Sequence, residues 1–182
     1  MQEDSNPIKD YLFEYIKNSP TIPELIINKK FDVIINKIIE NCFDKIITMD
    51  TKDVAVGIFA TGILHYLLTN ALLNSQRKIN HNRIELDIVI PDVKTLEKDP
   101  KKTLVIYIPL SSDVKTIQEK ILQLEKIQSI KENIWLVLSK EITINKKSFI
   151  LSKENDSFSK IIFEIAQFSN VHGTSKFKIL RI

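Results

Sequence analysis

Residues 103–110, TLVIYIPL, and residues 134–139, IWLVLS, are the two stretches that decide the fold. Both are nearly continuous apolar runs, which is typical of strands buried on both faces of a sheet. Between them, apolar residues at helical spacing predict a helix over 114–129, capped by the segment Ser111–Asp113. A strand, a crossover helix and a second strand form a right-handed parallel pair. The sequence therefore predicts an α/β fold built around these two strands.

The chain on either side supplies further elements. RIELDIVI at 83–90 alternates apolar and polar residues, which predicts a half-buried strand that ends at Pro91. The charged stretch VKTLEKDPKK at 93–102 is expected to be an exposed hairpin loop. Downstream, the same patterns predict a short strand at 148–151, a helix from about 157 to 169 and an edge strand at 175–182.

The residues before the sheet are predicted to be helical. Apolar residues at helical spacing predict helices or helical turns over 7–17, 21–28, 31–47 and 51–76. The last is apolar on nearly all sides, as expected of a core helix, and Gly57, Thr61, His65 and Thr69 recur along it every four residues. Such small side chains favour close packing against a strand layer, a neighbouring helix or a second copy, so we expect a homo-oligomer. The predicted organisation is a helical extension over 1–50 and an α/β domain over 51–182.

Composition bounds the class of protein. The chain has 182 residues, of which 43 % are hydrophobic and 27 % charged, with a net charge of +3, as in one ordinary globular unit. Cys42 is the single cysteine and lies on the apolar side of helix 31–47, which predicts a buried structural thiol and a cytoplasmic protein. The first ten residues lack a secretory pattern. The apolar run 54–73 contains His65 and Asn70, which favours a core helix and no membrane partner.

Few residues suit a catalytic or ligand site. No glycine lies at a strand-to-helix turn of the kind that cradles phosphates, and no G-x-S-x-G nucleophile motif occurs. Glu85 and Asp87 stand two apart on the predicted strand 83–90, so their side chains share one face near its end. Two acids in this arrangement suit a Mg²⁺ ion. The alternative is that both are solvated or hydrogen-bonded strand acids.

The order of predicted elements, an apolar helix, an acid-bearing strand, a buried strand, a crossover helix and a further strand, resembles that of the restriction-endonuclease-like PD-(D/E)XK superfamily. RIELDIVIPD at 83–92 is similar to the first motif strand of that family, which implies a metal-binding role for Asp87. IQEKILQLEKIQ at 117–128 resembles a helix of RecB-like and Holliday-junction-resolvase-like members. The resemblance implies a restriction-endonuclease-like mixed sheet flanked by helices.

The second motif of that family is an acid followed two residues later by a lysine, and it would fall in 103–110. This stretch has no charged residue. The resemblance therefore implies a degenerate active site that lacks half of the groups needed around a phosphodiester. We expect no cofactor, with Mg²⁺ bound only if the site is active.

The resemblance also implies nucleic acid as a partner. Lys101 and Lys102 before the central strand, with Lys176 and Lys178 in the last strand, are candidates for phosphate contacts. Arginine is scarce, which argues against base-specific recognition. The expected function is a non-catalytic nuclease-fold protein that binds nucleic acid or a nucleic-acid-processing partner. The alternatives are a homodimeric structural or regulatory interaction module without a ligand, and an active Mg²⁺-dependent nuclease.

Overall fold

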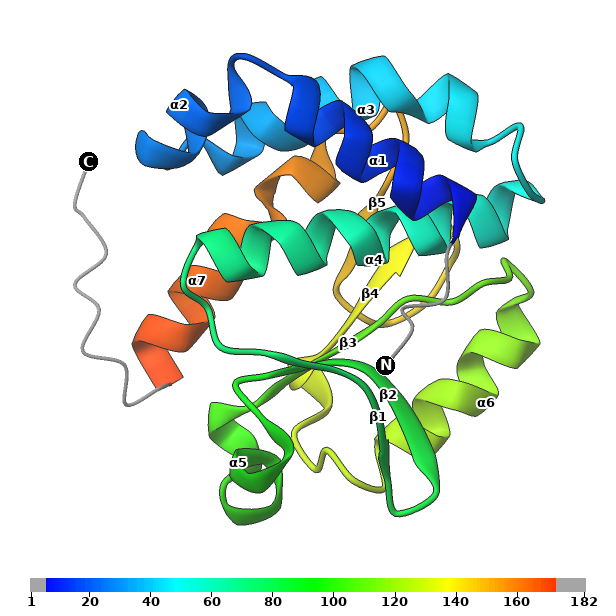
Figure 1. Cartoon of the computed structure of the whole chain (residues 1–182). Coiled ribbons are helices and arrows are strands. Elements are labelled where there is room, and N and C mark those ends of the chain that lie inside the picture. The colour runs from blue at the N-terminus through cyan, green and yellow to red at the C-terminus, as the bar shows by residue number, and fades with distance from the viewer. Residues whose placement is uncertain (1–5, 173–182) are drawn as a thin grey trace.

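A five-stranded mixed sheet forms the centre of the computed structural model, which describes residues 6–172 (Figure 1). The strands lie side by side in chain order: β1 (Gln76–His81), β2 (Ile84–Ile90), β3 (Leu104–Tyr107), β4 (Ile134–Leu138) and β5 (Ser148–Ile150). β2 runs antiparallel to both of its neighbours, whereas β3, β4 and β5 are parallel. The predicted α/β sheet with its parallel pair is therefore confirmed.

Helices cover both faces of this sheet. They are α1 (Pro7–Asn18), α2 (Ile22–Ile27), α3 (Phe31–Ile46), α4 (Lys52–Asn70), α5 (Val93–Lys98), α6 (Val114–Leu124) and α7 (Ile161–His172). Alternate residues of β4 point to opposite faces. Val137 joins the core formed with α1, α3, α4 and α7, while Leu136 packs against Ile117 and Ile121 of α6. Figure 1 shows the same separation, with α4 above the sheet and α6 beyond its other side.

The N-terminal helices share the main core of the α/β part. Leu12 of α1, Ile38 of α3 and Val137 of β4 belong to one continuous cluster of buried apolar side chains. Cys42 of α3 is fully buried in this cluster, as predicted, and burial raises the pKa of its thiol to about 11. The expected boundary at residue 50 thus lies within a single hydrophobic core.

Two glycines let α4 approach its neighbours closely. A Cβ atom on Gly57 would lie 2.4 Å from Leu110 Cδ2, and one on Gly62 would lie 2.7 Å from Leu12 Cδ2. The predicted close packing therefore takes place within the chain, against the segment after β3 and against α1. None of the helices within residues 6–172 combines the length and the hydropathy that crossing a bilayer requires.

Two predicted elements differ from the structure. Helix 51–76 ends at Asn70, because the polar stretch that follows pairs with β2 as strand β1. The expected exposed loop at 93–102 instead contains α5 and a 3₁₀ turn at Pro100–Lys102. Asp92 caps α5 by accepting a hydrogen bond from Thr95 N at 2.7 Å, and Leu96 anchors the helix with a 1 % exposed side chain. The capping bond and the buried leucine therefore stabilise a segment that is otherwise charged.

The remaining predictions agree in place but differ in extent. β3 is four residues long, because the chain leaves the sheet at Ile108 and turns toward α4. α6 and β5 occupy their predicted places. The expected edge strand at 175–182 lies outside the described residues.

Candidate functional site

Asp87 lies in the middle of β2 with a side chain that is only 11 % exposed. Antiparallel pairing places it beside Tyr107, the last residue of β3. Its Oδ2 atom accepts a hydrogen bond of 2.8 Å from the backbone N–H of Ile108. Its Oδ1 atom accepts one of 2.7 Å from Lys78 Nζ of β1. Both oxygens of this carboxylate are therefore engaged by the chain itself.

The charge of Lys78 is shared between two acids. Its ammonium lies 3.6 Å from Glu85 Oε1 as well as 2.7 Å from Asp87 Oδ1. Burial alone would lower the pKa of Lys78, but the two carboxylates outweigh burial and raise that pKa above its usual value. Burial, and then the negative charge of Asp87, raise the pKa of Tyr107 to about 12. These four residues, which we call the Asp87 cluster, hold a charged lysine and a protonated tyrosine at neutral pH.

Lys78 and Tyr107 are the residues of this cluster that the sequence analysis missed, and Lys78 was missed because β1 itself was not predicted. The strand is mostly polar, with Ile79 as its single apolar residue. A signal was nevertheless present in the two-residue turn between β1 and β2. Asn82 and Arg83 both have positive φ values, 51° and 65°, and Asn is a preferred residue of such hairpin turns.

The Asp87 cluster can be compared with what Mg²⁺ requires. This ion prefers near-octahedral coordination by about six oxygens. Here an ammonium lies between Glu85 and Asp87, and β3 contributes Tyr107 in place of an acid. Across residues 6–172, no group of three or more His, Cys, Asp or Glu side chains is arranged to hold a metal ion. These donors do not fit a Mg²⁺ site, so the metal assignment of Glu85 and Asp87 stays a prediction that the geometry does not support.

A second acid, Asp53 at the start of α4, joins three segments of the fold. Its Oδ2 atom accepts a hydrogen bond of 2.8 Å from Ser112 N, and its Oδ1 atom accepts one of 2.5 Å from Ser139 Oγ. Burial would raise the pKa of Asp53, but these hydrogen bonds hold it below its usual value. Asp113, rather than a serine, caps α6 by accepting from Thr116 N at 2.8 Å. Ser111 Oγ accepts a hydrogen bond of 3.1 Å from Asp113 N, so the serines before α6 support the turn that leads into the helix.

Two of the four basic candidates, Lys101 and Lys102, lie in the turn before β3. Lys101 is exposed in the 3₁₀ turn before β3, and Lys102 pairs with Asp99 at 3.1 Å. Lys176 and Lys178 lie outside the described residues. The structure therefore places the first two lysines and leaves their predicted association with the last two as a prediction.

Comparisons with known proteins give a similarity to a solved structure. The scan against protein-family models gives no match, and the search of curated proteins gives none either. Among solved structures, the chain is similar to metal-depleted Ecl18kI in complex with uncleaved, modified DNA, a restriction endonuclease, with 15 % sequence identity and a TM-score of 0.47. The match covers 97 % of this chain and 60 % of the other, so this chain spans about 60 % of the length of that enzyme. The five-stranded mixed sheet with its flanking helices is the α/β arrangement that the sequence predicted.

Proposed function

We propose that this protein binds nucleic acid through phosphate contacts and does not cleave it. The absence of cleavage is supported by the ion pair between Lys78 and Asp87. Metal-dependent hydrolysis of a phosphodiester needs carboxylate oxygens that are free to hold the metal beside the reacting phosphate. Both oxygens of Asp87 already accept hydrogen bonds, one from an ammonium and one from a backbone N–H.

The neighbouring strand offers no replacement for these groups. β3 reads LVIY, so it presents neither an acid to share a metal nor a lysine to approach the attacked phosphate. Tyr107 stands in the place closest to Asp87 and keeps its proton, since its pKa is about 12. Proton abstraction by this tyrosine at neutral pH is therefore disfavoured as well.

Binding is supported by charge. Lys101 is exposed to solvent in the turn before β3. Within residues 6–172, no carboxylate lies within 4.0 Å of the Lys101 ammonium, which leaves this group available for a phosphate. Contacts of this kind depend on salt and carry little sequence information.

The test is a paired cleavage and binding assay. The full chain is incubated with duplex, single-stranded and branched DNA and with RNA, in Mg²⁺ and in Mn²⁺. We expect intact substrates and binding that weakens as salt rises. The same result is expected for Lys78→Met, because freeing Asp87 does not supply the groups that β3 lacks.

Two outcomes would overturn the proposal. Cleavage by the wild-type chain that is absent from an Asp87→Asn variant with an unchanged melting temperature would establish a nuclease. Absence of binding to all four substrates at low salt would leave the interaction module without a ligand as the function.

A further inference from the structure

A small hydrophobic cluster beneath α6 is bordered by basic residues from three elements. It comprises Leu86, Val89, Leu96, Val105, Leu124 and Ile134, with Ile84, Val93, Tyr107 and Ile127 packed at its margin. Three of these four marginal residues have a basic neighbour in the chain, namely Arg83, Lys94 and Lys126. All three of these basic residues are exposed. Basic residues that are distant in sequence therefore lie next to the margin of one cluster.

Hydrogen bonds bring two further lysines to the same edge. The side-chain amide of Asn133 donates to Lys101 O and to Pro100 O, both at 3.3 Å. Gln128, which is fully buried, donates to Pro100 O at 3.1 Å and to Thr103 O at 2.7 Å. These bonds hold the turn that carries Lys101 against the segment 128–133, which carries Lys131.

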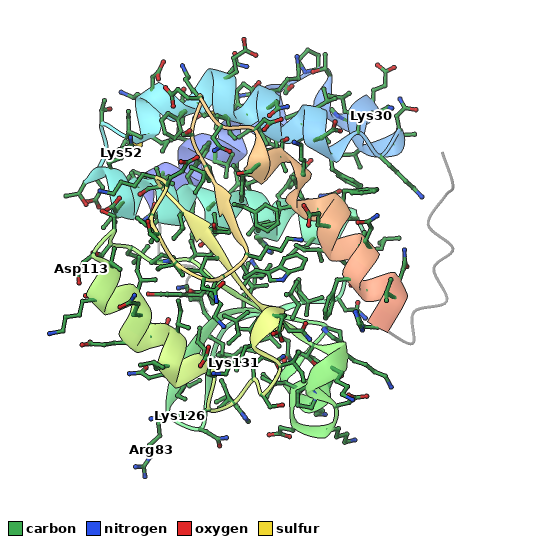
Figure 2. The ribbon with its side chains drawn as sticks, turned by 180° about the vertical axis from the view of Figure 1, so that it is seen from behind. Lys30, Lys52, Arg83, Asp113, Lys126 and Lys131 are labelled. Carbon is green, nitrogen blue, oxygen red and sulfur yellow. The ribbon has the colours of Figure 1, made fainter. Side chains whose placement is uncertain are left out.

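We call Arg83, Lys94, Lys101, Lys126 and Lys131 the basic strip. In Figure 2, the labelled Arg83, Lys126 and Lys131 lie together at the lower end of the molecule, while Lys30 and Lys52 are at its upper end. These three residues of the strip thus lie at one end of the fold, away from Lys30 and Lys52.

The acids around the basic strip are largely neutralised by other groups. Asp99 pairs with Lys102 at 3.1 Å. Glu125 pairs with Lys146 at 2.8 Å and with Lys131 at 3.1 Å, so two ammonium groups face one carboxylate and a positive charge remains. Among the described residues, no carboxylate lies within 4.0 Å of the charged groups of Arg83, Lys94, Lys101 or Lys126. Glu132 beside Lys131 and Glu97, three residues after Lys94, remain as exposed acids, and both oppose the field of the strip.

The chemistry of the strip distinguishes between forms of nucleic acid. Proteins that bind single strands combine positive charge with exposed aromatic side chains on which bases stack. Phe163 is the aromatic residue among the largely exposed hydrophobic side chains of residues 6–172, and it lies on α7 outside the strip. Tyr107 at the margin of the cluster is only partly exposed, so the strip has charge without a largely exposed aromatic side chain, and with a single arginine it lacks the means of reading bases in a groove.

The geometry points to the basic strip as the binding surface for the phosphate backbone of a nucleic-acid duplex, without base recognition. This inference rests on the proposed function and specifies the surface and the form of the partner. Glu132 lowers the affinity for nucleic acid, because its negative charge repels the phosphates that the strip attracts.

The experiment compares charge reversals at the two ends of the molecule. The strip variant is Arg83→Glu with Lys126→Glu, and the matched control is Lys30→Glu with Lys52→Glu, which changes the net charge equally. Both control residues lie at the beginnings of helices, where a glutamate is tolerated. Binding to a DNA duplex and to a single strand of equal length is measured across a salt series, and thermal melts establish that each variant is folded.

We expect wild-type chain to prefer the duplex. The strip variant should bind it about tenfold or more weakly at low salt, and its slope of log K against log salt should fall by about 2. The control should bind within about threefold of wild type, and Glu132→Gln should bind more tightly, with no effect on the control surface.

Three results would overturn the inference while the proposed function stands. They are equal losses in the strip and control variants, a strip variant that binds as wild type, and preference for the single strand. Failure of wild-type chain to bind any nucleic acid would overturn the proposed function itself. A folded strip variant that alone loses duplex binding supports both.

Discussion

Replacing each of the two glycines of α4 by alanine provides a test of packing and its control within one helix. Alanine in place of glycine inside a helix gains about 1 kcal/mol from backbone entropy. At Gly57, the new methyl meets Leu110 Cδ2 at 2.4 Å, but Leu110 is 49 % exposed and can rotate away. At Gly62, it meets Leu12 Cδ2 at 2.7 Å, and Leu12 is fully buried between α1 and the core. Overfilling a packed site costs about 1–3 kcal/mol.

We therefore expect Gly57→Ala to be neutral or stabilising and Gly62→Ala to be destabilising, with a difference of about 2 kcal/mol in the free energy of unfolding. For a chain of this size, such a difference corresponds to about 4–8 °C in melting temperature. Circular dichroism melts and urea titrations measure both variants. In a Leu12→Ala background the penalty at Gly62 should disappear, because the atom that the methyl meets is gone. The packing argument would be refuted if the melting temperature of Gly62→Ala equalled or exceeded that of Gly57→Ala.

Three further predictions concern the sheet, the Asp53 contacts and the thiol. Ile106→Asp should abolish soluble folded protein, because an unpaired carboxylate in a fully buried strand costs several kcal/mol, about as much as the whole stability; an unchanged thermal midpoint would contradict this. Asp53→Asn should destabilise the fold at neutral pH, and its difference from wild type should shrink on acidification. The lowered pKa contributes stability that is complete above the unfolded value of about 4 and is lost as pH falls through the lower folded value. Cys42 should react with a thiol reagent at pH 8 only after unfolding, since burial raises its pKa to about 11; rapid modification of the native chain would be the opposing result.

The central elements of the fold could be predicted from sequence because their patterns need no information from elsewhere in the chain. A fully apolar run such as Ile134–Leu138 has few alternatives to a buried strand. β1 and α5 are different, since both are largely polar. Each is ordered by contacts to other segments, β1 by pairing with β2 and α5 by burying Leu96. Local propensity does not contain these contacts.

The candidate site likewise contains a residue that the sequence could indicate and contacts that it could not. Asp87 could be singled out because it stands two residues after Glu85 on a predicted strand, and its place on β2 is confirmed, although it lies at the middle of the strand and not near its end. Its partner Lys78 depends on a hairpin register that the sequence analysis did not contain. The contact between Asp53 and Ser139 joins residues separated by 86 positions, and no local pattern indicates such a pair. Residue types are visible in a sequence, whereas the pairing of charges across the fold is not.

The ion pair of Asp87 links the shape of the sheet to the absence of cleavage that we propose. A carboxylate that is only 11 % exposed requires a compensating charge, which a metal ion or an ammonium can supply. In this chain the ammonium of Lys78 supplies it, and the same contact ties the polar edge strand β1 to β2. The hydrogen bond from Ile108 N then fixes the point at which the chain leaves β3 and turns toward α4. Asp87 thus holds β1, β2 and the end of β3 together, and in the function that we propose this structural role is the one that the acid keeps.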